Sequence, residues 1–204
     1  MGVAGNQTGT AGGQLHQGDA LLVTDIQNDF LPGGALGIEG ADAVVPVLAM
    51  YMRRFQARRL PIFLTRDWHP PDHCSFRRQG GPWPPHCIAG TPGSLPPPTF
   101  PSPPSAVLIY KAIDRDREAY SAFQGTALER HLRAGGVVRL FVGGLATDYC
   151  VSHTVEDARS LGYEVCLLMD GIRAVNVQPG DGRRAADDML RLGARPLTLE
   201  ELVT

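Results

Sequence analysis

The stretch VVRLFVGGLATDYCVSHTVEDARSL, residues 137–161, decides the fold. It begins with a short apolar run at 137–142, which has the length and continuity of a strand covered on both faces. A helical pattern follows at 148–161 and stops before Gly162, and a glycine just past the last turn is typical of a helix end. A buried strand followed directly by a helix predicts one unit of a parallel α/β sheet.

The same kind of unit recurs along the chain. Further apolar runs lie at residues 20–24, 60–65, 106–110, 163–169 and, more weakly, 196–199. Helical patterns lie between them at 42–58, 126–134 and 182–192. Because strand and helix alternate, we predict an α/β fold, a three-layer α/β/α sandwich with a mostly parallel six-stranded sheet and helices on both faces.

Two segments depart from this alternation. Residues 1–18 are rich in glycine and polar residues, so we expect a flexible N-terminal tail ahead of a single domain at 19–204. Residues 61–104 hold 13 of the 17 prolines, which excludes regular helix and central strand there. We therefore expect a long, stiffened loop after the second strand, and loops of this length are usually functional or disordered.

Composition narrows the class of function. The chain has 204 residues, 43% of them apolar, and 19 basic against 21 acidic side chains give a net charge of -2. A charge near zero argues against nucleic-acid binding, and no apolar run is long enough to span a membrane. The four cysteines lack zinc-ribbon spacing and no secretory signal is evident, so we expect free thiols in a reducing compartment. We therefore expect a cytoplasmic protein that acts on small molecules. The oligomeric state is left open, a homo-oligomer included.

Three reactive side chains follow three of the predicted strands. Asp25, Lys111 and Cys150 come after the runs at 20–24, 106–110 and 137–142. Each alone has an ordinary explanation, as a turn residue, a solvated amine or a small buried thiol. Ligands of open parallel sheets bind beyond the carboxyl ends of the strands, where all three meet. Together they predict a set for nucleophilic acyl transfer, in which Asp25 accepts the thiol proton.

The position of Cys150 gives it a reason to be reactive. If Thr147 or Asp148 is the helix N-cap, Cys150 lies in the first turn, where free N–H groups favour a thiolate. Lys111 is the only lysine among the 19 basic residues, and a compact ammonium nearby acts in the same direction. Backbone N–H groups around Ala146 and Cys150 are candidate oxyanion donors.

A second group of candidates lies in the proline-rich region. Three of the six histidines, His69, His73 and His86, fall within 18 residues. Asp67 lies two residues before the first of them. Carboxylate and imidazole suit Zn, Fe(II) or Mn, and neighbouring prolines would hold the ligands rigidly. We therefore assign a metal-binding loop to residues 66–104, with a polar turn as the alternative.

Aromatic residues follow the reactive positions or lie between them. They are Phe30, Trp68, Trp83, Tyr120 and Phe123. Such side chains can wall a pocket for a flat ring, although core packing explains any one of them equally well.

These residues fall into motifs that resemble a known family. The motifs are DIQNDF (25–30), RDWHP (66–70), GGPWPPHC (80–87), Lys111, AYSAF (119–123) and GGLATDYCV (143–151). The chain resembles the nicotinamidases, also called pyrazinamidases, of the isochorismatase-like cysteine hydrolases over about residues 20–200. The resemblance implies the fold of those hydrolases and the conversion of nicotinamide to nicotinate and ammonia in NAD salvage, with deamidation of pyrazinamide also expected.

The resemblance also implies roles for individual residues. By resemblance, the catalytic triad is Asp25, Lys111 and Cys150, and the metal ligands are Asp67, His69 and His86. The resemblance also implies pyridine contacts from Phe30, Trp83 and Tyr120, and a cis peptide at Leu145-Ala146 that shapes the oxyanion hole with Cys150. One divalent transition metal is implied, with Zn expected first and Fe or Mn as alternatives. His73 is left as either a fourth ligand or a residue outside the coordination sphere.

Two other functions compete with this one. A metal-free amidase of the same superfamily would act on a carbamoyl or ureido substrate, which the Asp67, His69 and His86 set disfavours. A zinc-stabilised binding protein without turnover would use four closed ligands, whereas three ligands and open positions favour catalysis.

Overall fold

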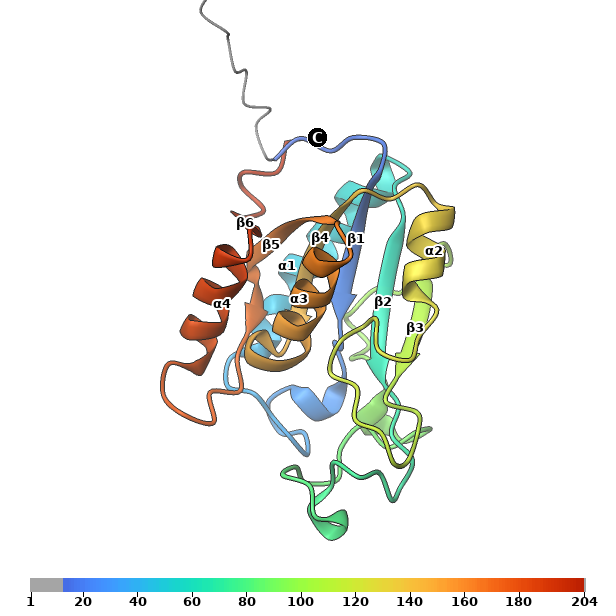
Figure 1. Ribbon diagram of the computed structural model, residues 1–204, viewed down its shortest axis with the longest axis vertical. Helices are drawn as coiled ribbons and strands as arrows, with labels where there is room; N and C mark the ends of the chain where they lie inside the picture. Colours follow the sequence, from blue (N-terminus) through green and yellow to red (C-terminus); the bar gives the residue numbers. More distant parts are fainter. Residues whose placement is uncertain (1–12, 204) are drawn as a thin grey trace, which may run out of the picture.

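The computed structural model of the chain describes residues 13–203. Six strands form one sheet in which every neighbouring pair is parallel, in the order β3-β2-β1-β4-β5-β6 (Figure 1). The strands are β1 (Asp19–Thr24), β2 (Ile62–Asp67), β3 (Val107–Lys111), β4 (Arg139–Leu145), β5 (Glu164–Arg173) and β6 (Arg195–Leu197). The predicted six-stranded parallel sheet is confirmed.

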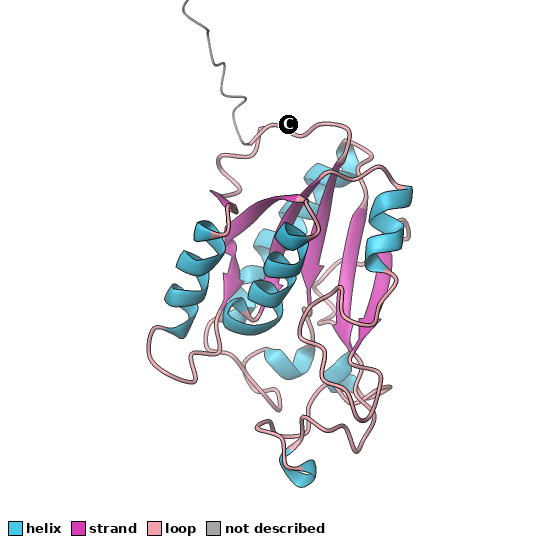
Figure 2. Ribbon diagram, viewed as in Figure 1, coloured by secondary structure: helices cyan, strands magenta, loops and turns pink. Residues whose placement is uncertain are grey.

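Helices cover both faces of the sheet, which completes the predicted three layers (Figure 2). They are α1 (Val44–Ala57), α2 (Leu128–Ala134), α3 (Ser152–Ser160) and α4 (Asp181–Arg191). The apolar stripe of α1 is fully buried in one core cluster, while α2, α3 and α4 contribute to a second cluster on the opposite face. Among residues 13–203, no helix has the length and apolar character needed to cross a bilayer.

The end of strand β5 differs from the sequence-based expectation. Strand β5 runs to Arg173, past Asp170 and Gly171, which interrupt its apolar run. The Asp170 carboxylate is satisfied there, because it accepts hydrogen bonds from the Tyr51 hydroxyl at 2.9 Å and the Leu199 N–H at 2.8 Å. Because its carboxylate accepts two hydrogen bonds, Asp170 can lie inside β5, although the apolar pattern of the sequence stops before it.

The start of the helix after β4 also differs. A π-helical turn, η5 (Thr147–Val151), precedes α3, and its N-cap is Ala146. The expectation that Thr147 or Asp148 caps the helix is wrong, because the Asp148 carboxylate accepts hydrogen bonds from the N–H groups of Val175 and Asn176 at 2.9 and 2.8 Å. This residue ties the end of β5 to the turn that carries the cysteine.

The expected N-terminal tail is only partly within the described residues. Residues 1–12 lie outside them, whereas Leu15 is fully buried and its carbonyl accepts a hydrogen bond from Arg58 at 3.2 Å. Gln14 forms an isolated bridge with Val203. The packed chain therefore begins before residue 19, because an apolar side chain within the glycine-rich stretch joins the core.

The long loop between β2 and β3 lies beyond the carboxyl ends of the strands (Figure 1). Its regular pieces are two 3-10 turns, η3 (Arg77–Gln79) and η4 (Pro92–Ser94), as its proline content predicts. Two further 3-10 turns, η1 (Asn28–Phe30) and η2 (Ala41–Ala43), follow β1. The segments that follow β1 and β2 therefore cover this edge of the sheet.

Candidate active site

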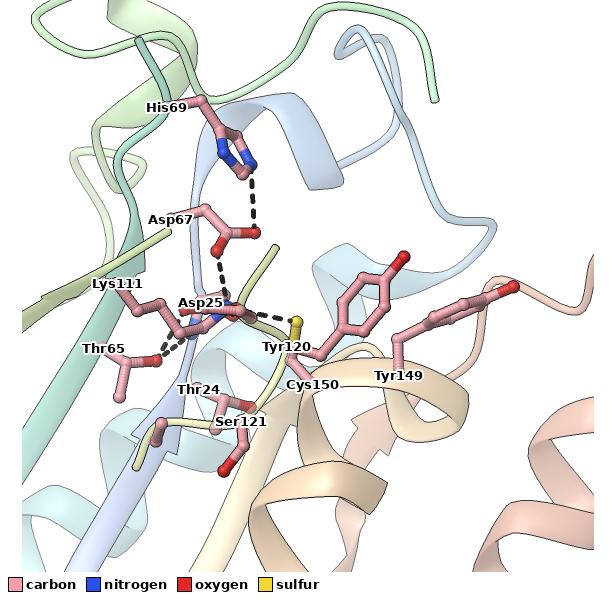
Figure 3. A network of polar contacts seen from close by, with 12 residues as sticks. Thr24, Asp25, Thr65, Asp67, His69, Lys111, Tyr120, Ser121, Tyr149 and Cys150 are labelled. Atoms are coloured by element: carbon pink, nitrogen blue, oxygen red, sulfur yellow. Dashed lines mark hydrogen bonds and ion pairs between the residues drawn. The ribbon is translucent and has the colours of Figure 1, made fainter. Parts of the chain in front are cut away.

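The three residues predicted as a catalytic set come together at this edge (Figure 3). Asp25 follows β1, Lys111 ends β3, and Cys150 lies in η5, all with at most 5% of their surface exposed. The Lys111 Nζ atom lies 3.0 Å from Asp25 Oδ2 and 3.4 Å from Cys150 Sγ. The lysine therefore stands between the carboxylate and the thiol.

Thr65 fixes the carboxylate of Asp25. Its hydroxyl donates to Asp25 Oδ1 at 2.6 Å and accepts the Asp25 N–H at 3.3 Å. Among the described residues, Asp25 Oδ2 accepts no hydrogen bond of good geometry and has Lys111 as its ion-pair partner. One carboxylate oxygen is thus held, and the other is left to exchange a proton. Sequence reasoning missed Thr65; the available signal was its place two residues before Asp67, on the same face of β2.

Lys111 has more partners than the sequence suggested. Its ammonium also donates to Asp67 Oδ1 at 2.5 Å and to the Ala119 carbonyl at 3.2 Å. The register of the sheet explains the first contact, since Asp67 and Lys111 are opposite each other on β2 and β3. Asp67, predicted as a metal ligand, therefore also contacts the lysine of the catalytic set.

Burial and charge set the protonation states of this group. The carboxylates of Asp25 and Asp67 raise the pKa of Lys111 well above its usual value, although burial opposes them, so the ammonium stays charged. Burial raises the pKa of the Cys150 thiol well above its usual value, despite the opposing charge of Lys111. The expected thiolate at a helix start is therefore not the resting form, and the thiol must lose its proton during attack.

Asp25 is suited to receive that proton. Burial raises the pKa of its carboxyl group, and Lys111 and Thr65 act in the opposite direction. Oxygen atoms of Asp25 and Asp67 and the Sγ atom of Cys150 lie within 4.8 Å of one another. A buried carboxylate with a raised pKa, close to a buried thiol, can take up a proton that an exposed aspartate would hold weakly.

Asp67, His69 and His86 form a second, adjoining cluster. Their ligand atoms lie within 4.8 Å of one another, and all three residues are buried. Both ring nitrogens of His69 are buried and have no hydrogen-bond partner among the described residues. The His86 Nδ1 atom lies 2.8 Å from the Pro84 carbonyl, which fixes the proton on that nitrogen and leaves Nε2 a lone pair.

These residues fit a divalent transition metal. The His69 Nε2 atom lies 3.7 Å from Asp67 Oδ2, too far for a hydrogen bond (Figure 3). Buried imidazole nitrogens without a hydrogen bond are costly unless something else binds them. The buried group also has two carboxylates, Asp25 and Asp67, against the single ammonium of Lys111, and a bound cation would offset the excess negative charge. Burial lowers the pKa of His86, which keeps its imidazole in the neutral form that binds metals.

His73 is engaged elsewhere, although it is fully buried beside this cluster. Its Nδ1 atom lies 2.7 Å from the Ser75 hydroxyl, and its Nε2 atom lies 3.1 Å from the Arg117 carbonyl. Its ring contacts that of His69, with centroids 4.3 Å apart. We propose that His73 supports His69 rather than acting as a fourth ligand.

An apolar pocket opens onto both clusters. Among its lining residues are Phe30, Trp83 and Tyr120, together with Cys150 and all three candidate metal ligands. The Trp83 ring N–H donates to the Tyr120 hydroxyl at 2.9 Å, so the two walls are joined. Tyr149 also lines the pocket, and its ring contacts those of Trp83 and Tyr120. Sequence reasoning missed Tyr149, whose only signal was its position directly before the cysteine.

The backbone leading to Cys150 has an unusual path. The Leu145-Ala146 peptide bond is cis, as the resemblance implies. The Thr24 hydroxyl is 3.2 Å from both the Gly143 and the Leu145 carbonyl oxygens. Gly144 has φ of 120°, and a Cβ atom there would lie 2.0 Å from the Thr24 carbonyl oxygen, so only glycine fits.

A buried thiol beside an ammonium and a carboxylate, at the carboxyl edge of a parallel α/β sheet, is the arrangement expected of a hydrolase that uses a cysteine nucleophile. The isochorismatase domain model matches residues 19–201, and the chain belongs to that family.

The chain is similar to several characterised members. It is 37% identical to the nicotinamidase of Escherichia coli (strain K12) over 203 residues, which cover 89% of this chain and 95% of that protein. Among solved structures, the zinc complex of Pyrococcus horikoshii pyrazinamidase is 43% identical with a TM-score of 0.85, covering 89% of this chain and 99% of that one. An L. infantum protein in complex with nicotinate is 34% identical with a TM-score of 0.85, covering 92% and 96%.

Proposed function

We propose that this protein is a metal-dependent cysteine amidohydrolase that converts nicotinamide to nicotinate and ammonia, within one domain spanning residues 19–204. The observation that carries the proposal is the single pocket lined by Cys150, by the metal-ligand candidates and by aromatic side chains. Relatives named as nicotinamidase and pyrazinamidase support the same substrate class. Pyrazinamide also presents a carboxamide on a nitrogen heterocycle and is a second expected substrate, and nicotinate production assigns the protein to NAD salvage.

The first chemical step joins the thiol to the substrate carbonyl carbon. Asp25 Oδ2 accepts the Cys150 proton as Sγ attacks the carboxamide carbon, because Oδ1 is already held by Thr65. Lys111 stays charged between the two and stabilises the negative charge that moves from sulfur to oxygen. Backbone N–H groups of Ala146 and Cys150 are proposed to hold the developing oxyanion.

The second step releases ammonia. Asp25 returns the proton to the leaving nitrogen, the C–N bond breaks, and the acyl group remains on Cys150 as a thioester. Water then attacks the thioester, with Asp25 as the base, and nicotinate leaves with the thiol restored. One carboxylate thus serves as base and then as acid, as its raised pKa permits.

Asp67, His69 and His86 would hold the metal, for which Zn is the first expectation and Fe or Mn are alternatives. When bound, the metal supplies a Lewis-acid centre for the pyridine nitrogen. The chain itself contributes the pocket walls, since Phe30, Trp83 and Tyr120 are positioned to enclose a flat ring. The partner implied by this arrangement is a small molecule.

A metal-free amidase acting on a carbamoyl or ureido substrate is disfavoured by one observation. Such an enzyme would leave two buried nitrogens of His69 without a hydrogen bond among the described residues. A zinc-stabilised binding protein is disfavoured because the three candidate ligands line a pocket that the Cys150 thiol also lines.

The proposal is tested by ammonia release from nicotinamide, pyrazinamide and a ureido compound. The assay is repeated after chelation and after Zn, Mn or Fe(II) is added back. We expect turnover of the two aromatic amides, its loss on chelation and its return with metal. Turnover of the ureido compound alone, or undiminished activity without metal, would overturn the proposal.

A further inference from the structure

Gln27 holds the backbone of Asp67 with its side chain. Its Oε1 atom accepts the Asp67 N–H at 2.9 Å, and its Nε2 group donates to the Asp67 carbonyl at 2.8 Å. A third hydrogen bond runs from Nε2 to the Ser94 carbonyl at 2.9 Å. Gln27 is fully buried, so both ends of its amide bond to backbone groups rather than to water.

These bonds replace strand pairing that has ended. The paired register between β1 and β2 extends only to Val23 and Leu64, and the chain turns away after β1 at Asp25, which has φ of 50°. Strand β2 continues to Asp67, three residues beyond the last of these pairs. The Gln27 amide offers that residue the donor and acceptor that a neighbouring strand would have supplied.

Asp29 makes a comparable contact at the second metal-ligand segment. Its Oδ2 atom accepts the Cys87 N–H at 2.7 Å, and its Oδ1 atom accepts the Ala35 N–H at 3.3 Å. Cys87 directly follows His86 and has φ of 46°, so its peptide is held in a left-handed turn. Gly93 packs against the same carboxylate, since a Cβ atom there would lie 2.2 Å from Oδ2.

Two side chains, two residues apart, therefore bond to the backbone at both ends of the candidate ligand set. Asp67 lies at the base of the long loop, and His86 lies 19 residues further along it. The hydrogen bonds of Gln27 and Asp29 hold both of these positions against the segment that directly follows Asp25. The loop need not fix the ligand spacing by itself.

We propose that Gln27 and Asp29 are positioning residues for the metal centre, which set the separation of Asp67 and His86 before the metal binds. The inference rests on the proposed function, because it takes this cluster as the metal site. Neither side chain bonds to a reacting atom. Hydrogen-bond partners that orient metal ligands typically change metal affinity about 10- to 100-fold when removed.

The test measures zinc affinity directly, by competition with a chromophoric chelator, in Gln27→Met and Asp29→Ala. Met keeps the length of Gln27 without its amide. The matched control is Asn28→Ala: Asn28 lies between the two, and its side chain donates to the Pro92 carbonyl at 2.8 Å, away from both ligand segments. Unfolding of each metal-free protein is followed by circular dichroism.

We expect zinc affinity to fall at least about tenfold in both variants and to stay within about twofold in Asn28→Ala. At saturating zinc, kcat should recover substantially. Asp29→Asn, which keeps one acceptor oxygen, should fall between wild type and Asp29→Ala. If Gln27→Met does not fold, the Asp29 pair decides the question alone.

Unchanged zinc affinity in folded Gln27→Met or Asp29→Ala would overturn the proposal, as would an equal loss in Asn28→Ala. The zinc measurement needs no substrate, so the two proposals fail separately. A wild-type protein that binds zinc but does not deamidate nicotinamide contradicts only the proposed function. A wild-type protein that binds no zinc contradicts the positioning role.

Discussion

Replacing Thr65 with valine tests how the catalytic base is held. Valine matches the shape of threonine but lacks the hydroxyl that donates to Asp25 Oδ1 at 2.6 Å, and Thr65 is only 2% exposed. A buried hydrogen bond to a charged group contributes about 1.5–3 kcal/mol. Since one pKa unit corresponds to about 1.4 kcal/mol, the loss should raise the pKa of the Asp25 carboxyl by about one to two units.

The direction of the kinetic effect follows from the role of Asp25. On the proposed mechanism, the free enzyme is active only with the Asp25 carboxyl deprotonated. A further rise in the pKa of that carboxyl therefore removes activity at a higher pH than in the wild type. The assay is kcat/KM for nicotinamide across the acid limb of the pH profile, in metal-loaded protein. Because Asp25, Lys111 and Cys150 interact, the limb reports the titration of the set.

Thr65→Ser is the control, since it keeps the hydroxyl and removes only a methyl group. We expect its acid limb to stay near that of wild type while the limb of Thr65→Val moves to higher pH. An unmoved acid limb in folded, metal-loaded Thr65→Val would refute the assignment of Asp25 as the base held by Thr65.

Three further predictions concern charge, the pocket wall and stability. Lys111→Arg keeps the net charge but should not sustain turnover, because the larger guanidinium would occupy space beside the thiol; ammonia release near the wild-type rate would contradict this. Tyr120→Phe removes the acceptor of the Trp83 ring N–H, so steady-state kinetics should show a KM raised by about 2- to 10-fold and a nearly unchanged kcat; an unaltered KM would argue against a role in the pocket wall. Burial lowers the pKa of both His73 and His86, so the unfolded chain binds more protons as pH falls. The free energy of unfolding of the metal-free protein, measured with urea, should therefore decrease below about pH 6.5, and an increase would contradict the neutral state of these rings.

The fold could be predicted because its pattern is local. Each run of apolar residues is long enough for a buried strand, and each helix except the first is followed by glycine. The edge of the sheet that carries Asp25, Lys111 and Cys150 follows from parallel pairing alone. The stripe on α1 likewise needs only the period of a helix.

The rest depends on contacts between residues far apart in the chain. In the sequence, Gln27 is an ordinary polar residue after a strand. Its role depends on β2 extending beyond its last pair with β1, which the sequence does not show. The contact of Lys111 with Asp67 depends on the register between β2 and β3, which no local pattern fixes. Leu15 is a single apolar residue in a glycine-rich stretch, and only the packed core shows that it is buried.

The protonation state of the Cys150 thiol also could not be predicted from the sequence. A position near a helix start favours a thiolate, but the amount of burial decides the pKa of the thiol. Burial outweighs the opposing charge of Lys111 here. On the proposed mechanism, the thiol therefore transfers its proton to Asp25 at the moment of attack.

The central claim is that Cys150 is the nucleophile that attacks the carboxamide. The most direct measurement is ammonia release from nicotinamide by zinc-loaded Cys150→Ala, beside wild type and with circular dichroism to confirm the fold. We predict a folded, metal-binding protein whose ammonia release is at the level of the uncatalysed reaction. Substantial ammonia release by this variant would contradict the account.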